Sequence, residues 1–212
     1  MIKQEEIALF IEAGQKVGAE HLQLCSSGNI SWRIQNGLAL VSGTGSWLGQ
    51  MKEENVAICR IADGQHLEGA RPSMESTFHL NILREREDVN VVLHFQSEYA
   101  TAIACMKEKP QNFNVTAEIP CHLGSEIPII PYFRPGSPEL AQAVTQALKE
   151  HDAALLSKHG QVVCGKDFND ALQKALFFEM ACGIIMHAGK GNYEVLSPEE
   201  IEDLQHYILK KS

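Results

Sequence analysis

The sequence predicts an α/β fold with a mostly antiparallel central sheet that is covered by helices. Three observations support this prediction. Short strand-like segments occur in pairs joined by tight turns, and helical segments with one apolar face are spread along the chain. The 212 residues suit one substantial core, since domains commonly have about 100 to 200 residues. We therefore predict a single domain over residues 1–212.

The first part of the chain indicates one helix followed by hairpins. Apolar residues recur at helical spacing over residues 1–20 and predict an amphipathic helix. Residues 29–34 and 38–42 have strand character, and the Asn36-Gly37 pair between them is a strong hairpin signal. Residues 56–61 predict another strand, and the Ala-Asp-Gly sequence after it predicts another hairpin turn.

The middle of the chain mixes helices with buried strands. Its apolar patterns predict a helix over 75–86, a strand over 89–95, a short helix over 100–106 and a strand over 126–131. These assignments put Glu75 at the start of a helix and His94 near the end of a strand.

The last part of the chain carries clear helix starts. Ser137-Pro138-Glu139 combines a serine cap, a proline in the first turn and an acid near the positive helix end. Ser197-Pro198-Glu199-Glu200 is a capping box. The segments predicted here are a helix from 138 to about 150, a hairpin of strands 153–157 and 161–165 with His159 in its turn, a helix over 167–188 and a helix ending at Lys210.

Composition excludes several classes of function. The chain has 27 acidic and 18 basic residues, which argues against a nucleic-acid-binding face. No segment approaches the roughly 20 apolar residues of a membrane span, and the start of the chain does not resemble a secretory signal. Six cysteines without a C-x-x-C pair predict buried, reduced thiols. We expect a cytoplasmic protein, and a small anionic substrate is compatible because backbone amides can bind phosphate.

Four residues are candidates for a metal site. Glu75, His94 and His159 are suited to bind a divalent transition metal, and Gln96 offers a weaker, neutral oxygen. Gln96 follows His94 by two positions on a predicted strand, so both side chains are expected on one face. The spacing of the four residues is too irregular to define a site by itself, and a structural role is the alternative for each histidine.

Five short motifs give these candidates a context. In chain order they are Ser27-Gly28-Asn29-Ile30-Ser31, Ser42-Gly43-Thr44-Gly45, Arg71-Pro72-Ser73-Met74-Glu75, His94-Phe95-Gln96-Ser97 and Lys158-His159-Gly160. Together they resemble the class II aldolase/adducin family, and within it most of all the L-fuculose-1-phosphate aldolases. The resemblance extends over nearly the whole chain and implies a three-layer α/β/α fold.

The resemblance assigns roles to the candidate residues. It implies that Glu75, His94 and His159 bind Zn²⁺ and that Glu75 also transfers protons. It implies a phosphate-binding pocket formed by Gly28, Asn29, Thr44, Gly45, Ser73 and Met74. Met74 departs from the family pattern, which usually has a second serine there, so one phosphate donor is missing.

Gln96 is the larger departure, because the family pattern has histidine at that position. A carboxamide oxygen is a poorer zinc ligand than imidazole and suits harder ions better. We expect weaker zinc binding, a relaxed choice of divalent metal or a water-filled fourth position, and a site that has lost catalysis is the alternative.

The remaining polar residues are less informative. Tyr132 corresponds to a tyrosine near the site in related aldolases, with a core aromatic as the alternative. Tyr207 is the tail tyrosine that could help to protonate the aldehyde, with a tyrosine on a helix face as the alternative. Glu118 is a possible substitute acid, with a solvated loop charge as the alternative. The other histidines are interpreted as surface or packing residues: His21, His66, His79, His122, His151, His187 and His206.

The function that the resemblance implies is metal-dependent retro-aldol cleavage of a deoxyketose 1-phosphate. The best candidate is L-fuculose 1-phosphate, which would give dihydroxyacetone phosphate and L-lactaldehyde. A homotetramer with sites between subunits is also implied. The alternatives are a sugar-phosphate epimerase or dehydratase of the same family and a non-enzymatic, adducin-like scaffold.

Overall fold

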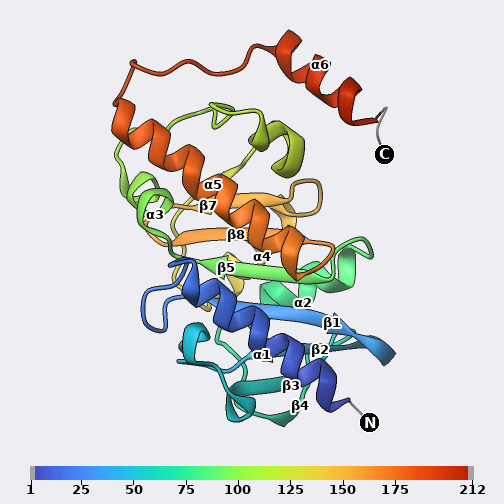
Figure 1. Ribbon diagram of the computed structural model, residues 1–212. Helices are drawn as coiled ribbons and strands as arrows, with labels where there is room; N and C mark the ends of the chain where they lie inside the picture. The colour runs from blue at the N-terminus through green and yellow to red at the C-terminus, as the bar shows by residue number, and fades with distance from the viewer. Residues whose placement is uncertain (1–2, 210–212) are drawn as a thin grey trace.

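The computed structural model describes residues 3–209, and its centre is an eight-stranded sheet with the order β4-β3-β2-β1-β5-β8-β7-β6 (Figure 1). All neighbouring strands are antiparallel except β6 and β7, which are parallel. The strands are β1 Asn29–Ile34, β2 Leu38–Ser42, β3 Val56–Arg60, β4 His66–Gly69, β5 Val91–Phe95, β6 Ile129–Ile130, β7 Ala153–Leu156 and β8 Gly160–Gly165. The predicted α/β class and the mostly antiparallel sheet are confirmed.

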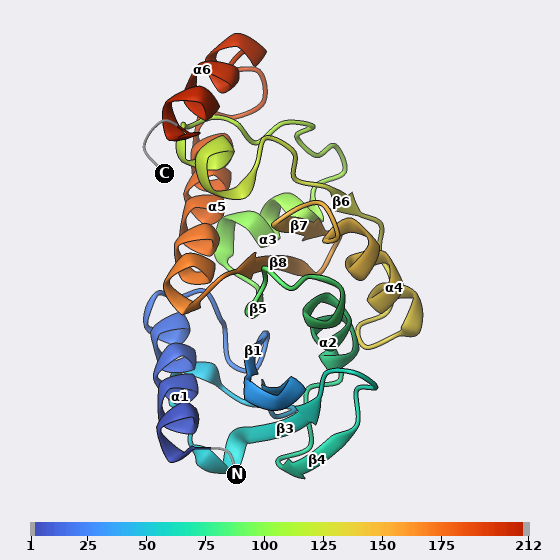
Figure 2. The ribbon, with the colours of Figure 1, turned by 90° about the vertical axis from the view of Figure 1, so that its right-hand side faces the viewer.

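Helices cover both faces of the sheet. The helices are α1 Gln4–Ala19, α2 Ser76–Glu85, α3 Glu98–Cys105, α4 Pro138–Ala147, α5 Phe168–Ala188 and α6 Pro198–Leu209. Figure 2 shows α1 and α5 on one side of the sheet and α2 and α4 on the other. Two hydrophobic clusters fill the two interfaces, one under α1, α3 and α5 and one under α2 and α4. These layers confirm the three-layer arrangement.

Strand β5 shows how the sheet separates the two cores. Val91, Leu93 and Phe95 belong to the cluster under α1, α3 and α5, whereas Val92 belongs to the cluster under α2 and α4. Side chains alternate along a strand, so His94 faces the α2 layer with Val92. Its ring meets the ring of Phe78 from α2 edge to face. A polar residue is thereby held inside an apolar layer.

The predicted hairpins are present. Asn36 and Gly37 have positive φ angles of 63° and 69° in the turn that joins β1 to β2, and Ile34 pairs with Leu38 beside it. Asparagine and glycine tolerate this backbone region better than other residues. The hairpin of β7 and β8 also forms, with His159 in its turn.

Several predicted boundaries were wrong. The strand expected over 126–131 has only the two residues Ile129–Ile130. It lies at the sheet edge, and Pro128 and Pro131 on either side lack the N–H group that would extend the ladder. The helix expected to reach about residue 150 ends at Ala147. A short π-helix, η4, Ile119–Leu123, was not predicted at all.

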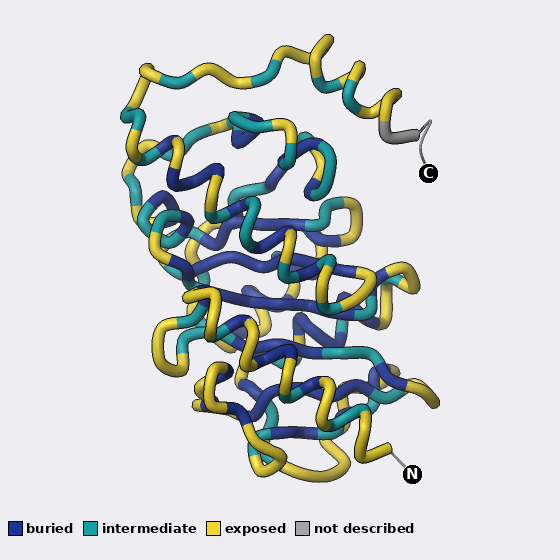
Figure 3. The backbone as a smooth tube through the Cα atoms, in the orientation of Figure 1, coloured by how far each residue is buried: buried dark blue, intermediate teal, exposed yellow. Residues whose placement is uncertain are grey.

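The C-terminal helix α6 extends from the body beyond η4, and much of it is exposed (Figure 3). Its capping box is present, because the Ser197 amide donates to Glu200 Oε2 at 2.7 Å and the Glu200 amide donates to Ser197 Oγ at 3.2 Å. Lys210, its predicted end, lies outside the described residues.

The thiols differ from the expectation in their burial. All six cysteines are free, but Cys25 and Cys105 are exposed. Within residues 3–209, no helix combines the length and apolar character needed to cross a lipid bilayer.

Candidate metal centre

Three of the four predicted metal-binding residues come together. One ligand atom from each of Glu75, His94 and His159 lies within 4.8 Å of the others. Glu75 directly precedes α2, His94 lies near the end of β5, and His159 lies in the turn between β7 and β8. Segments that are far apart in the chain therefore converge at one edge of the α2 layer.

Local backbone contacts hold Glu75 at the start of α2. Its amide donates to Ser73 Oγ at 3.3 Å, and the Ser73 amide donates to the carbonyl of Ser42 at 3.0 Å. A bridge between Gly43 and Pro72 adds to this link. The loop before α2 is thus anchored to the end of β2, which fixes the direction of the Glu75 side chain.

The turn that carries His159 depends on a close approach of backbones. Lys158 has a φ of 57°, and the His159 amide donates to the carbonyl of Leu156 at 3.1 Å. A Cβ atom at Gly160 would lie 2.6 Å from the carbonyl oxygen of Phe95 and 3.0 Å from Cε1 of His94. Only glycine fits there without displacing the end of β5, so the Gly at 160 allows the two histidines to meet.

The three side chains face one another, and each has a buried polar atom without a hydrogen-bond partner among the described residues. Glu75 Oε2 lies 3.4 Å from His94 Nε2, and Glu75 Oε1 lies 3.5 Å from His159 Nε2. Among the described residues, Glu75 Oε1, His94 Nε2 and His159 Nδ1 are buried without a hydrogen-bond partner. Buried polar groups are rarely left in this state without a reason.

The protonation pattern of the histidines suits a metal. His94 Nδ1 donates to the carbonyl of Gln161 at 2.8 Å, which leaves Nε2 facing Glu75. Burial, together with the neighbouring His94, lowers the pKa of His159 to about 4, so this imidazole is neutral near pH 7. Metals bind neutral imidazole and carboxylate. The donor set therefore fits a divalent transition metal held by Glu75, His94 and His159.

Gln96 lies beside this cluster but just beyond the end of β5, rather than on the strand as predicted. It is half-buried, and a Cβ atom at Gly160 would lie 2.8 Å from its Cγ. The same Cβ position touches His94, so the Gln96 side chain passes close to the His94 ring. Its role as a ligand stays a prediction.

The segments predicted to bind phosphate also lie side by side. Ser42 Oγ accepts from the Ile30 amide at 3.1 Å, and the Thr44 amide donates to the carbonyl of Arg71 at 2.9 Å. Thr44 and Gly45 are exposed, and Met74 is 65% exposed. A Cβ atom at Gly28 would lie 2.9 Å from the carbonyl oxygen of His94. The predicted phosphate-binding loops therefore border the metal candidates.

Asn29 has a different environment from the one expected. Its amide nitrogen donates to Glu75 Oε2 at 3.0 Å, and its oxygen lies 2.5 Å from His79 Nε2. Both ends of the carboxamide are engaged inside the protein. Its predicted contact with phosphate stays a prediction.

The two candidate tyrosines lie on the surface. Tyr132 is 56% exposed and follows β6, which runs parallel to β7. The alternative of a core aromatic is therefore wrong. Tyr207 is also 56% exposed and lies on α6, which both views place beyond η4 and away from α2 (Figures 1 and 2). Within this chain, α6 does not bring Tyr207 to the metal candidates.

His79, expected to be a surface or packing residue, is fully buried, so the surface alternative is wrong. Its hydrogen bonds to Asn29 and Ser31 were not predicted from the sequence. A signal was available, because His79 follows Glu75 by four positions in a helical segment and such residues share a face. Asn29 and Ser31, two apart on a strand, share a face as well.

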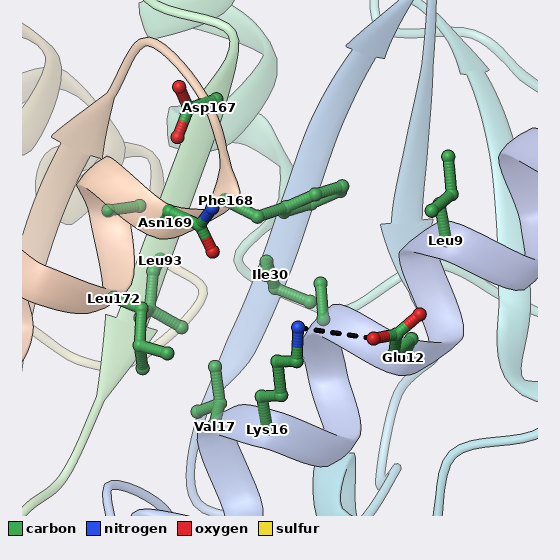
Figure 4. Close-up of a pocket in the computed structure, with 12 residues that line it drawn as sticks. Leu9, Glu12, Lys16, Val17, Ile30, Leu93, Asp167, Phe168, Asn169 and Leu172 are labelled. Atoms are coloured by element: carbon green, nitrogen blue, oxygen red, sulfur yellow. Dashed lines mark ion pairs between the residues drawn. The ribbon is translucent and has the colours of Figure 1, made fainter.

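A separate cavity lies between α1 and α5 on the opposite face of the sheet (Figure 4). Its volume is about 220 Å³, and apolar side chains such as Val17, Ile30 and Phe168 contribute to its walls. The charged pair at its rim, Lys16 and Glu12, is already joined at 3.1 Å. None of the predicted site residues lines this cavity.

Comparisons with known proteins identify a family for this chain. A family model described as Class II Aldolase and Adducin N-terminal domain matches residues 8–186. A 3-oxo-tetronate 4-phosphate decarboxylase from Haemophilus influenzae is 30% identical over 93% of this chain and 91% of its own length. A 5-deoxy-D-ribulose 1-phosphate aldolase from Bacillus thuringiensis serovar kurstaki is 31% identical over 96% of this chain and 95% of its own length.

A solved structure gives the same result for the fold. An L-fuculose 1-phosphate aldolase superposes with a TM-score of 0.89 at 25% identity, and the match covers 99% of this chain and 98% of that one. The family resemblance is confirmed. The finer expectation, that L-fuculose-1-phosphate aldolases are most similar, is not supported, because the similar proteins include a decarboxylase as well as aldolases.

Proposed function

This chain belongs to the class II aldolase and adducin family, and we propose that it is a metal-dependent lyase that breaks a carbon–carbon bond beside the carbonyl group of a phosphorylated sugar or sugar acid. The observation that carries the proposal is the cluster of Glu75, His94 and His159, in which Glu75 Oε1 and His94 Nε2 are buried without hydrogen-bond partners among the described residues. In a non-enzymatic scaffold, we would expect buried polar atoms such as these to have hydrogen-bond partners.

Glu75 is the residue that we assign to proton transfer. Asn29 holds Oε2, while Oε1 is buried without a hydrogen-bond partner among the described residues. A divalent ion bound by Glu75, His94 and His159 would supply Lewis-acid stabilisation of negative charge on a substrate oxygen. A carboxylate with one free oxygen beside the reacting atoms can then take up or return a proton.

The preferred reaction is decarboxylation of a 3-oxo-tetronate 4-phosphate. Support comes from the relative of that name, which matches nearly the whole chain. Loss of carbon dioxide from such a β-keto acid leaves negative charge on the carbon next to the carbonyl group, and protonation of that carbon gives dihydroxyacetone phosphate. The departing carbon dioxide needs no proton from the enzyme, so this reaction does not require Tyr132 or Tyr207.

The second candidate is retro-aldol cleavage of a deoxyketose 1-phosphate such as L-fuculose 1-phosphate. The aldolase relative and the aldolase structure support it. Cleavage leaves negative charge on the same carbon of the same three-carbon phosphate, but the other product is an aldehyde, and a hydroxyl proton must be removed to form it. A tyrosine would assist this step, and Tyr132 and Tyr207 remain our candidates.

Both candidate reactions yield dihydroxyacetone phosphate, so the experiment measures the formation of this product. The metal-loaded protein is incubated with 3-oxo-tetronate 4-phosphates and with deoxyketose 1-phosphates, and dihydroxyacetone phosphate is followed by its enzymatic reduction. Carbon dioxide or an aldehyde as second product separates decarboxylation from retro-aldol cleavage. Absence of dihydroxyacetone phosphate with both substrate classes, after addition of zinc, cobalt or manganese, would contradict the proposed function.

We also propose that the active form is a homotetramer with sites between subunits. Support comes from Met180 and Ile184, which are 40% and 38% exposed and lie one turn apart on α5. The projection of α6 from the body also suits contact with another subunit. Analytical ultracentrifugation tests the assembly, and a monomer at assay concentration would contradict it.

A further inference from the structure

A continuous chain of buried hydrogen bonds runs from Glu75 into the protein. Glu75 Oε2 accepts from Asn29 Nδ2 at 3.0 Å, Asn29 Oδ1 lies 2.5 Å from His79 Nε2, and His79 Nδ1 lies 2.8 Å from Ser31 Oγ. Ser31 and His79 are fully buried, and Asn29 is 6% exposed. The chain connects the carboxylate to groups on β1 and α2 that lie away from the metal-facing side.

The direction of each hydrogen bond follows from the carboxylate. Glu75 as a carboxylate can only accept, so the Asn29 nitrogen must face it. The opposite orientation of Asn29 would set its oxygen against Glu75 Oε2 at 3.0 Å, which is repulsive. Asn29 Oδ1 then faces His79, so His79 Nε2 carries the proton and Nδ1 accepts from the Ser31 hydroxyl. Every bond therefore donates towards Glu75.

The surroundings hold the imidazole in its neutral form. Burial, together with the nearby His94, lowers the pKa of His79 to about 3. The ring stacks on Phe78, with 4.6 Å between ring centroids. Asn29 is paired in register with His94 across β1 and β5, so the residue that His79 supports stands beside a candidate ligand.

We propose that His79 is a positioning residue that orients Glu75 through Asn29. With Asn29 fixed by His79, Oε2 of Glu75 stays bonded and Oε1 stays turned towards His159. The role in metal binding and proton transfer rests on the proposed function of Glu75, whereas the hydrogen-bond chain does not.

The first test measures the tautomer of His79 in metal-free protein. Long-range ¹H–¹⁵N correlation of ¹⁵N-histidine-labelled protein distinguishes a proton on Nε2 from one on Nδ1, and the signals lost in His79→Gln identify the residue. We expect a neutral ring with the proton on Nε2. A proton on Nδ1 or a charged ring near pH 7 would overturn the inference.

The second test measures zinc affinity by competition with a chelator. His79→Phe keeps a buried ring but removes the donor to Asn29, and partners of metal ligands typically contribute about 10- to 100-fold to affinity. His79→Gln places an amide donor near the position of Nε2, so it should retain most of the wild-type affinity. Equal weakening by both variants, or no weakening by His79→Phe, would overturn the inference.

The third test asks whether His79 acts through Asn29. Asn29→Leu should weaken zinc binding, and adding His79→Phe to it should weaken binding little further, because the supported residue is already absent. Additive effects would mean that His79 acts by another route. Thr145→Val serves as the control, since Thr145 is a buried donor to the Ala141 carbonyl on α4 and lies outside the chain. It should lower stability without changing zinc affinity.

Failure of the inference and failure of the proposed function give different results. If no substrate is cleaved or zinc does not bind, the proposed function fails, and the tautomer measurement still decides the hydrogen-bond chain. If cleavage occurs but His79 has its proton on Nδ1, only the positioning role fails.

Discussion

Two glutamates lie on opposite faces of the sheet, and they differ in the hydrogen bonding of their carboxylate oxygens. Glu179 of α5 accepts from the Tyr99 amide at 2.7 Å with Oε1, and from Ser97 Oγ at 2.5 Å and the Ala100 amide at 2.9 Å with Oε2. Glu75 has one donor, Asn29, and its other oxygen is buried without a hydrogen-bond partner among residues 3–209.

The difference distinguishes a carboxylate with a structural role from one that we propose to take part in the reaction. A carboxylate with all its donors in place is stable where it is and has little left to offer a ligand. A carboxylate that keeps one buried oxygen bare retains the capacity to bind a metal or a proton, at a cost to folding. Glu179 therefore stabilises the start of α3, whereas Glu75 is the carboxylate that we propose takes part in the reaction.

The strongest test of this contrast is Glu75→Gln. We expect a loss of lyase activity of roughly 10²- to 10⁴-fold, because that is the usual contribution of a group that transfers protons. The melting temperature of metal-free protein should change little or rise, since an unpaired buried charge is removed. Activity is measured by dihydroxyacetone phosphate release. Near wild-type activity would show that Glu75 does not transfer the proton.

The matched change on the other face is Glu179→Gln. Its amide would oppose the N–H groups at the start of α3, and we expect a loss of about 1 to 3 kcal/mol in the free energy of unfolding. Zinc affinity should remain close to that of the unchanged protein. Urea unfolding and chelator competition measure the two quantities. Unchanged stability would mean that Glu179 is not the structural counterpart of Glu75.

Gln96→His tests whether residue 96 faces the metal ion proposed to bind beside Glu75. Imidazole is a better zinc ligand than a carboxamide oxygen, so zinc affinity should rise about tenfold if residue 96 faces the ion. Isothermal titration in the presence of a competing chelator measures the change. Unchanged affinity would indicate that this side chain points away from the cluster.

We expect the pH dependence of stability to arise on the sheet face that carries Glu75, because His79 and His159 lie there. Burial lowers the pKa of His79 from 6.5 to about 3 and that of His159 from 6.5 to about 4. Between pH 6.5 and 4 the unfolded chain therefore binds more protons than the folded one, so stability falls as pH falls. For metal-free protein we expect a loss of about 1 kcal/mol between pH 7 and 6.

Thermal unfolding across this pH range provides the measurement. His79→Phe removes one of the two groups and should make the dependence shallower. A dependence as steep as that of the unchanged protein would show that His79 does not remain neutral in the folded state.

Local patterns were sufficient to predict most of the fold. The Asn36-Gly37 turn and the capping box at Ser197 are determined by residues adjacent in the chain, and both formed as expected. The start of α3 at Glu98 was missed, because its N–H groups are satisfied by Glu179, which is distant in sequence.

Contacts between residues distant in sequence also limited the prediction of the site. The chemistry of Glu75, His94 and His159 was evident, and the order of motifs justified grouping them. The link between Asn29 and His79 could not be predicted with the same ease, since it depends on how α2 packs across β1. Gln96 was placed on a strand because alternation was extended one residue too far.

The central position of β5 has a consequence for the way the protein folds. This strand pairs with β1 on one side and β8 on the other, and both pairings join residues that are far apart in the chain, such as Asn29 with His94 and Val91 with Gly165. Such non-local pairings form slowly. During synthesis, the edge of β5, the strand that carries His94, stays unpaired until the turn at His159 and the following strand β8 have emerged from the ribosome. A nascent chain that stalls before β8 exposes that edge to other chains, so aggregation of incomplete chains is the hazard that comes with this metal centre.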